Sequence, residues 1–260
     1  MQIRDMSFVV CMVPVAPLRK EAAHRSEMVS QLLFGELAEV TGETDLFTQL
    51  RCVYDGYEGW CQKTQVLPVD INVADPNDKR LVAGWTETAT LNGSPIHLSL
   101  GTPLAVFKEG QVNIGRAALH YDGASHVPGI AEFNEENLKR ISSLYLNTAY
   151  LWGGRSVFGI DCSGLVQQVF RFFNKPLPRD AWQQAEQGEV VGFLQEVQCG
   201  DLAFFDNEEG RITHVGLMWD EHTIIHSSGK VRVDQIDNMG IISSDTAERT
   251  HKLRIIKRYA

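Results

Sequence analysis

The 260-residue chain has 43% hydrophobic and 22% charged residues, which is the composition of an ordinary soluble protein. Its formal net charge of −9, without any basic cluster, argues against a nucleic-acid partner. No apolar run approaches the roughly 18 residues of a membrane span, and five scattered cysteines indicate a reducing compartment rather than a disulfide framework.

Residues 1–13 are a poor secretion signal, because their basic region is thin and Asp5 lies within it. We therefore expect a cytoplasmic protein. A periplasmic or secreted protein whose leader had been removed would begin in the same way.

Over the first 127 residues, short apolar runs alternate with turn residues, which predicts β-structure with little helix. Strand candidates are 36–40, 49–54 and 59–61, and a second β-rich stretch covers about 80–125. The sequence thus predicts three domains, 1–68, 69–128 and 129–260, and the segment 31–69 of the first has the size of a small barrel.

From about Val127 onwards the pattern predicts helices first and a run of strands afterwards, which is typical of an α+β domain. Asn134 followed by two glutamates predicts a helix start, with the helix ending near Leu146. The loop at 150–154 contains Trp152, whose ring we expect to line a cleft.

Cys162 is expected in the first turn of a second helix, because a helical apolar stripe follows it and Asp161 precedes it as a plausible N-cap. Unpaired N–H groups and the helix dipole favour a thiolate at this position. The same N–H groups would donate to an oxyanion. The alternative is a buried, inert cysteine.

Two histidines lie on strands predicted at 213–219 and 223–228, with a tight turn at 220–222. A hairpin centred on Glu221 pairs Gly216 with His226 and brings His214 and His226 to one face, with their Cα atoms roughly 7–8 Å apart. His214 would then take the proton of Cys162, and His226 would accept from the other ring nitrogen of His214 and fix its tautomer.

A zinc site made by Cys162, His214 and His226 is the competing interpretation. The sequence contains neither a Cys-x-x-Cys nor a His-Glu-x-x-His motif, so we predict no metal and no cofactor.

Several motifs of the C-terminal half resemble those of NlpC-type cysteine peptidases. They are Tyr150-Leu-Trp-Gly-Gly154, Asp161-Cys-Ser-Gly-Leu-Val166, Pro178-Arg-Asp180, Gly200-Asp-Leu202, His214-Val-Gly216 and Ile225-His-Ser227. This resemblance implies a papain-like domain, a catalytic set of Cys162, His214 and His226, and hydrolysis of bacterial cell-wall peptides.

The N-terminal half is similar to the bacterial SH3-like barrel of one subgroup, the γ-D-glutamyl-L-diamino-acid endopeptidases. The matching segments are 16–19, 30–36 and 55–60. The resemblance implies two SH3-like barrels before the peptidase domain, and cleavage of murein peptides between γ-D-glutamate and the diamino acid when the N-terminal L-alanine is free.

The same resemblance implies substrate contacts from both halves of the chain. Tyr57 and Glu27 would bind the ammonium end, and Asp161 and Ser163 would contact substrate beside the nucleophile. The free carboxylate of D-glutamate requires a cation or N–H donor nearby. Arg179 and Arg155 are candidates, and the alternative for either is a structural ion pair.

Three other functions are weighed against this reaction. They are a secreted hydrolase of intact wall that uses its barrels for wall binding, a non-enzymatic wall-recognition protein, and a lipid acyl-transfer enzyme. The complete Cys-His-His set disfavours the second, and the lack of membrane-binding character disfavours the third.

Overall fold

The computed structural model describes residues 7–259, so part of the segment considered above as a secretion signal lies outside the described residues. The chain divides into two compact units. Unit 1 contains the described residues up to Pro128 together with Trp152–Val157, and unit 2 contains Gly129–Leu151 and the residues from Phe158 onwards. The predicted boundaries at 68/69 and 128/129 stay predictions.

The first part of unit 1 is a seven-stranded antiparallel sheet in the order β3-β2-β6-β5-β4-β1-β7. The strand candidates 36–40, 49–54 and 59–61 are confirmed as β4, β5 and β6. The strands are β1 Phe8–Cys11, β2 Val15–Arg19, β3 Met28–Leu33, β4 Leu37–Glu43, β5 Phe47–Cys52, β6 Glu58–Gln62 and β7 Val66–Val69, with 3₁₀ turns at Lys63–Gln65 and Ile71–Val73.

The second part of unit 1 differs from the single closed barrel that the family resemblance implies. It contains a four-stranded sheet, β10-β9-β12-β11, and a separate two-stranded sheet, β13-β8. The bounds are β8 Leu81–Val82, β9 Thr86–Leu91, β10 Ser94–Ser99, β11 Gln111–Ile114, β12 Ala117–His120 and β13 Ser125–His126. These strands are short, so much of their stability comes from the core beneath them.

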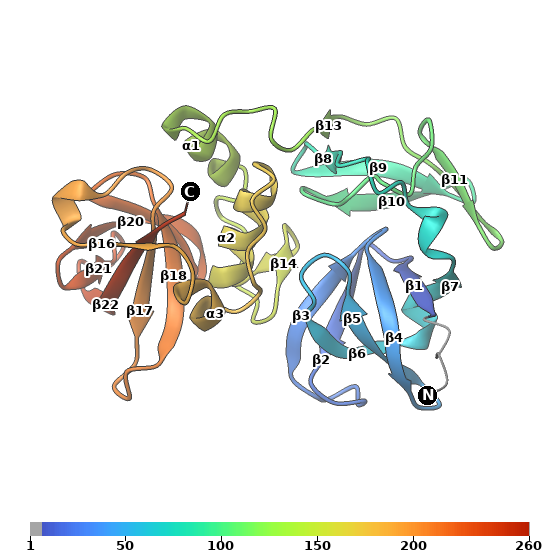
Figure 1. Cartoon of the computed structure of the whole chain (residues 1–260), viewed down its shortest axis with the longest axis horizontal. Helices are drawn as coiled ribbons and strands as arrows, with labels where there is room; N and C mark the ends of the chain where they lie inside the picture. The colour runs from blue at the N-terminus through green and yellow to red at the C-terminus, as the bar shows by residue number, and fades with distance from the viewer. Residues whose placement is uncertain (1–6, 260) are drawn as a thin grey trace. The chain divides into compact units, whose positions relative to one another are not determined.

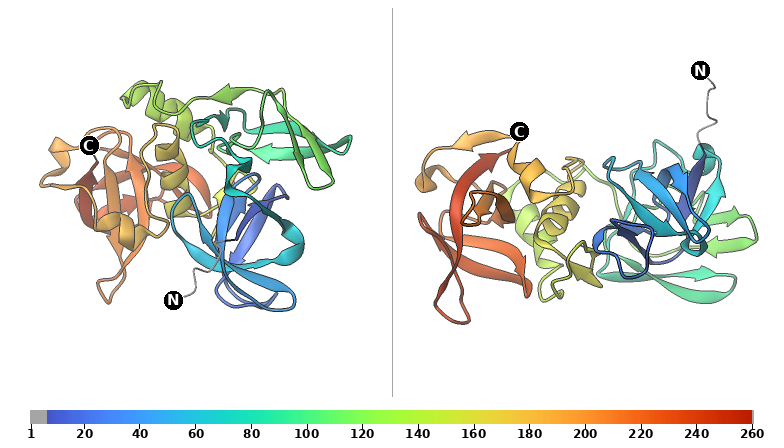
Figure 2. Two further views of the ribbon diagram at one scale, coloured as in Figure 1. Left: turned by 45° about the vertical axis from the view of Figure 1, so that its right-hand side comes forward. Right: turned by 90° about the horizontal axis from the view of Figure 1, so that it is seen from below.

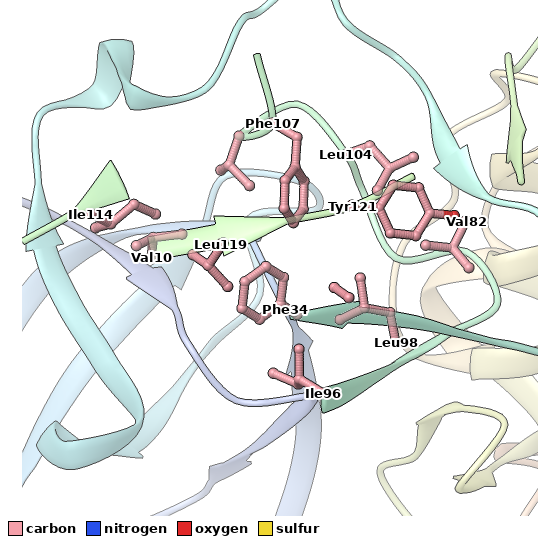
Figure 3. Close-up of a cluster of buried hydrophobic side chains, with 12 residues drawn as sticks. Val10, Phe34, Val82, Ile96, Leu98, Leu104, Phe107, Ile114, Leu119 and Tyr121 are labelled. Atoms are coloured by element: carbon pink, nitrogen blue, oxygen red, sulfur yellow. The ribbon is translucent and has the colours of Figure 1, made fainter. Parts of the chain in front are cut away.

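A shared hydrophobic core joins the two parts of unit 1 (Figure 3). Val10 and Phe34 come from the first part, and they pack in one cluster with Leu98, Phe107 and Leu119 from the second part. The ring centroids of Phe34 and Phe107 lie 6.0 Å apart. Because both parts contribute to one core, their folding is coupled through apolar burial.

Unit 2 is built from three α-helices and an antiparallel sheet among its described residues (Figure 1). Helices α2 and α3 pack on β18, and α2 also packs on β19. The helices are α1 Glu135–Ser143, α2 Cys162–Arg171 and α3 Ala181–Ala185, with a 3₁₀ turn at Leu194–Glu196. The strands are β15 Gly159–Ile160, β16 Glu189–Val191, β17 Leu202–Asp206, β18 Ile212–Met218, β19 Thr223–Ser228, β20 Lys230–Asp237, β21 Gly240–Ile242 and β22 Arg249–Arg258, and the short strand β14 Arg155–Ser156 belongs to unit 1.

Six strands of unit 2 close into a barrel, because β22-β17-β18-β19-β20-β21 form one row and β21 also pairs with β22. Figure 2 shows the strong curvature of these strands, coloured from orange to red. Side chains from all six strands form one hydrophobic cluster: Ala203, Phe205, Met218, Ile224, Ile236, Ile241 and Ile256.

The two helix starts predicted from the sequence are confirmed. The Asn134 side chain accepts from Asn137 N at 3.0 Å at the start of α1. The Asp161 side chain accepts from Gly164 N at 2.7 Å at the start of α2. Each carboxylate or amide oxygen thus satisfies an N–H group that has no partner within its helix.

No helix within residues 7–259 is long and apolar enough to cross a membrane.

Candidate active site

Cys162 is the first residue of α2 and is buried, with 6% of its surface exposed. Burial raises the pKa of its thiol to about 12, and the nearby carboxylate of Asp161 acts in the same direction. Backbone hydrogen bonds from Val215 and Ser163 oppose this shift. The expected preference for a thiolate is therefore outweighed here, because desolvation of a charged sulfur exceeds the stabilisation from the helix start.

His214 and His226 lie next to each other on the barrel, as the predicted hairpin register requires. Gly216 pairs with His226, Leu217 with Ile225 and Met218 with Ile224, which confirms a turn centred on residue 221. His214 Nε2 and His226 Nδ1 are 2.9 Å apart, and both rings are buried. Since Val215 bonds the sulfur of Cys162, the strand that carries His214 also contacts the thiol.

A carboxylate that the sequence analysis missed extends this pair. Asp234 Oδ2 lies 3.0 Å from His226 Nε2, and only 3% of Asp234 is exposed. Pairing in the sheet places Asp234 opposite Ile224, which puts it diagonal to His226 on the same face. In the sequence, polar Arg232 and Asp234 alternate with apolar Val233 soon after the strand of His226. This alternation could have indicated that Asp234 faces the same side of the sheet as His226.

A third imidazole, also missed, stacks on the first. The rings of His214 and His251 lie 4.1 Å apart at their centroids, with an angle of 25° between their planes. Burial, followed by the neighbouring imidazole of His226, lowers the pKa of His251 to about 4. Burial and the imidazoles of His226 and His251 hold the pKa of His214 well below its usual 6.5. His214 and His251 are therefore neutral at pH 7.

Ring nitrogens of His214, His226 and His251 lie within 4.8 Å of one another, so these residues are the candidate ligands for a metal ion. However, the His214 and His226 nitrogens already face each other at hydrogen-bond distance, and the other nitrogen of His226 faces Asp234. A metal would have to displace the first of these hydrogen bonds. The arrangement suits proton transfer better than metal binding.

Asp161, Ser163 and Arg179 form one buried network beside the thiol. Arg179 Nη2 donates to Asp161 Oδ2 at 2.6 Å, and Nη1 donates to Asp161 Oδ1 at 3.0 Å and to Ser163 Oγ at 2.8 Å. Arg179 is only 2% exposed. Its guanidinium holds the Asp161 carboxylate in a two-point geometry that also serves the helix N-cap.

The other three predicted substrate-binding residues, Glu27, Tyr57 and Trp152, belong to unit 1. Trp152 Nε1 donates to Glu27 Oε1 at 2.9 Å, so the structure brings this pair together. Tyr57 follows the turn after β5, where its backbone N–H donates to Asp55 Oδ1 at 3.0 Å. Their roles toward a substrate stay predictions.

Arg155, considered above as a second candidate for a substrate carboxylate, is completely buried. Its guanidinium lies 3.1 Å from Glu36 Oε2, and it also donates to the carbonyl oxygen of Gln31. These contacts assign Arg155 to the interior of unit 1. A buried guanidinium needs such partners, because an unpaired charge there is costly.

Comparison with known proteins places these features in a family. Residues 147–249 match the NlpC/P60 family, and residues 18–66 match the bacterial dipeptidyl-peptidase Sh3 domain. A γ-D-glutamyl-L-lysine dipeptidyl-peptidase of Bacillus subtilis is 31% identical over 76% of this chain and 71% of its own length. A dipeptidyl-peptidase 6 of Lysinibacillus sphaericus is 26% identical over 86% of this chain and 89% of its own length.

The fold also matches that of a solved structure. The crystal structure of an NlpC/P60 family protein from Bacillus cereus superimposes with a TM-score of 0.79 at 20% identity, and the match covers 97% of this chain and 99% of that one. The second unit thus has the papain-like fold of the family, and an SH3-like domain precedes it. Together with the buried thiol and the hydrogen-bonded histidines, these matches establish that the chain is a cysteine peptidase of the NlpC/P60 family with a bacterial dipeptidyl-peptidase SH3 domain.

Proposed function

We propose that this peptidase cleaves murein peptides between γ-D-glutamate and the following diamino acid, and that it requires a free N-terminal L-alanine. The observation that carries the proposal is the hydrogen bond between His214 and His226, with His214 on the strand whose Val215 contacts the Cys162 sulfur. The names of the Bacillus subtilis and Lysinibacillus sphaericus relatives support the substrate class.

In this proposal His214 acts as a general base. It removes the thiol proton as the sulfur of Cys162 attacks the carbonyl carbon of γ-D-glutamate, and N–H groups at the start of α2 donate to the oxyanion. Because the pKa of the thiol is raised, proton transfer accompanies the attack instead of preceding it. His214 then returns the proton to the leaving amine, and water hydrolyses the thioester to release the acid and the thiol.

Glu27 and Tyr57 are proposed to bind the ammonium group of L-alanine. An ammonium group taken from water requires a carboxylate or other acceptors. The hydrogen bond from Trp152 fixes one oxygen of Glu27, and the other lies 3.9 Å from Lys20 Nζ on an exposed surface. Asp161 and Ser163 are proposed to contact the peptide beside the nucleophile, and Arg179 to hold both in place.

Mass spectrometry of the products from L-Ala-γ-D-Glu-diaminopimelate tests the proposal. We expect release of L-Ala-γ-D-Glu from the free peptide and no cleavage when its N-terminus is acetylated. Cys162→Ala should abolish cleavage while the far-UV spectrum stays unchanged. Equal cleavage of the acetylated peptide would contradict the assigned roles of Glu27 and Tyr57, and turnover by the alanine variant would contradict the thiol mechanism.

The same assay separates peptide recycling from digestion of intact wall. We propose that released peptides in the cytoplasm are the substrate, so intact peptidoglycan should yield no dipeptide at the enzyme concentration that consumes the free peptide. Rapid release of dipeptide from intact wall, or recovery of the native protein outside the cytoplasmic fraction, would favour the secreted hydrolase instead.

A further inference from the structure

Asp234 is a buried carboxylate for which the proposed Cys-His-His chemistry has no use. It lies on β20, with its Oδ2 directed at His226 and its Oδ1 held by other donors. Transferring an ionised carboxylate from water into a protein interior costs several kcal/mol unless hydrogen bonds or opposite charges compensate. The contacts of Asp234 therefore show what keeps this charge in place.

Those contacts keep Asp234 ionised. Burial by itself would raise the pKa of Asp234, but hydrogen bonds from His226, Ser244 and Arg232 lower it well below its usual range. The Ser244 hydroxyl and backbone N–H both donate to Oδ1, at 2.6 and 3.0 Å. Arg232 Nε lies 3.1 Å from Oδ1 and 2.9 Å from Oδ2. An ionised carboxylate can only accept hydrogen bonds.

This acceptor sets the protonation of both histidines in turn. His226 Nε2 must carry a proton to donate to Asp234, and in this tautomer of the imidazole ring Nδ1 has a free lone pair. That lone pair accepts from His214 Nε2 across 2.9 Å, which places the proton of His214 on Nε2. Nδ1 of His214 is then unprotonated, as a base toward a thiol requires.

We propose that Asp234 is a positioning residue that fixes the tautomers of His226 and His214, so that the peptidase operates a Cys162–His214–His226–Asp234 relay. This inference rests on the proposed function for its kinetic tests. Arg232 also pairs with Asp245, since its Nη1 lies 2.7 Å from Asp245 Oδ2. The positive charge of Arg232 is thereby shared between two carboxylates. The Asp234 carboxylate therefore remains a negatively charged hydrogen-bond acceptor for His226.

Asp234→Asn is the most informative substitution. Both Ser244 donors require an oxygen at the Oδ1 position, so the new amide group would place its NH₂ opposite His226 Nε2. The NH₂ would donate to Nε2 and move the His226 proton to Nδ1, and His214 would then have to accept on Nε2 and carry its proton on Nδ1. We expect kcat to fall by at least about 100-fold with little change in KM, by the same wrong-tautomer effect that an Asp→Asn change has in serine protease triads.

Asp234→Ala separates this role from a structural one. Alanine removes the orienting acceptor but does not impose the wrong tautomer, so we expect Asp234→Asn to be less active than Asp234→Ala although it keeps more of the buried contacts. A purely structural role predicts the reverse order, with activity following stability. Asp237→Asn is the matched control: Asp237 lies on the same strand and pairs with Arg249 on the surface, so its substitution should leave kcat unchanged.

Nitrogen-15 NMR of the histidine rings in the wild-type chain gives a test that needs no substrate. We expect a protonated Nε2 and an unprotonated Nδ1 for both His214 and His226. A protonated Nδ1 on His226 in the wild-type protein would overturn the inference even if the enzyme cleaves its peptide. Failure to cleave that peptide, with the expected tautomers present, would instead overturn only the proposed function.

Discussion

At the scale of single residues, Cys162 shows how burial and helix position compete. The helix start and two backbone N–H groups favour a thiolate, whereas removal from water disfavours it and determines the outcome. Burial lowers the pKa of the neighbouring His214, whereas it raises that of Cys162, because in both residues burial disfavours the charged form. A neutral thiol beside a neutral imidazole is therefore the resting state, and in the proposed mechanism the thiolate forms only during attack.

This resting state predicts the pH dependence of the enzyme. His214 must be neutral to accept the thiol proton, and its pKa lies well below 6.5 because of burial and the adjacent imidazoles. We expect kcat/KM for the free peptide to stay constant as the pH is lowered through 6.5 and to fall only at more acidic pH, where His214 becomes protonated. The dependence of kcat/KM reports the free enzyme. An acid limb centred at or above 6.5 would contradict this assignment.

At the scale of secondary-structure elements, the β18–β19 hairpin determines how the histidines meet. Gly216 lies opposite His226, and a Cβ atom at residue 216 would come within 2.6 Å of Ile224 Cδ1 and 3.0 Å of His226 Cβ. Because residue 216 has no side chain, Ile224 and His226 can pack closely against its backbone.

Gly216→Ala should therefore displace His226 from His214 without unfolding the barrel. We expect a loss of about 10- to 100-fold in kcat, since displacements near 1 Å in a catalytic set have effects of that order. Gly192→Ala is a suitable control, because its Cβ would meet only Glu196 Oε2, at an ordinary 3.7 Å. Unchanged kcat in Gly216→Ala would show that the hairpin tolerates the added methyl group.

The first helix of unit 2 gives a stability test at the same scale. Asn134 accepts from the backbone N–H of Asn137 at 3.0 Å and caps α1. Asn134→Ala should lower the free energy of unfolding by about 1 kcal/mol, as is usual when an N-cap side chain is removed. Denaturant titration followed by circular dichroism measures this change, and an unaltered midpoint would show that the cap contributes nothing to stability.

At the scale of the whole molecule, one loop belongs to a different unit from its neighbours in sequence. Trp152–Val157 is part of unit 1, although the residues on both sides of it belong to unit 2. Arg155 holds this loop in unit 1 through Glu36, at 3.1 Å in a fully buried position. The same loop supplies Trp152, which bonds Glu27.

Glu36→Gln should destabilise unit 1 strongly, because it removes the negative charge of Glu36 from the buried Arg155 guanidinium. We expect the free energy of unfolding to fall by about 3 kcal/mol, the lower end of the range for breaking a buried ion pair. Glu58→Gln removes a partner of the exposed Arg51 and should change stability little, since solvent screens that pair. Similar effects of the two substitutions in thermal unfolding would contradict the importance assigned to the buried pair.

The sequence by itself determined the local features of this protein: the N-caps Asn134 and Asp161, the helix that begins at Cys162, and the register that pairs Gly216 with His226. Periodicity, capping residues and hairpin geometry involve only a few neighbouring residues, so they can be predicted from the sequence. The tertiary structure alone decided the contacts of Asp234 and His251 with the two histidines, the pairing of Arg155 with Glu36, and the open arrangement of the second β-rich region. These contacts depend on how strands pair in the sheet and on a core shared by distant segments, and the sequence pattern of one segment does not specify them.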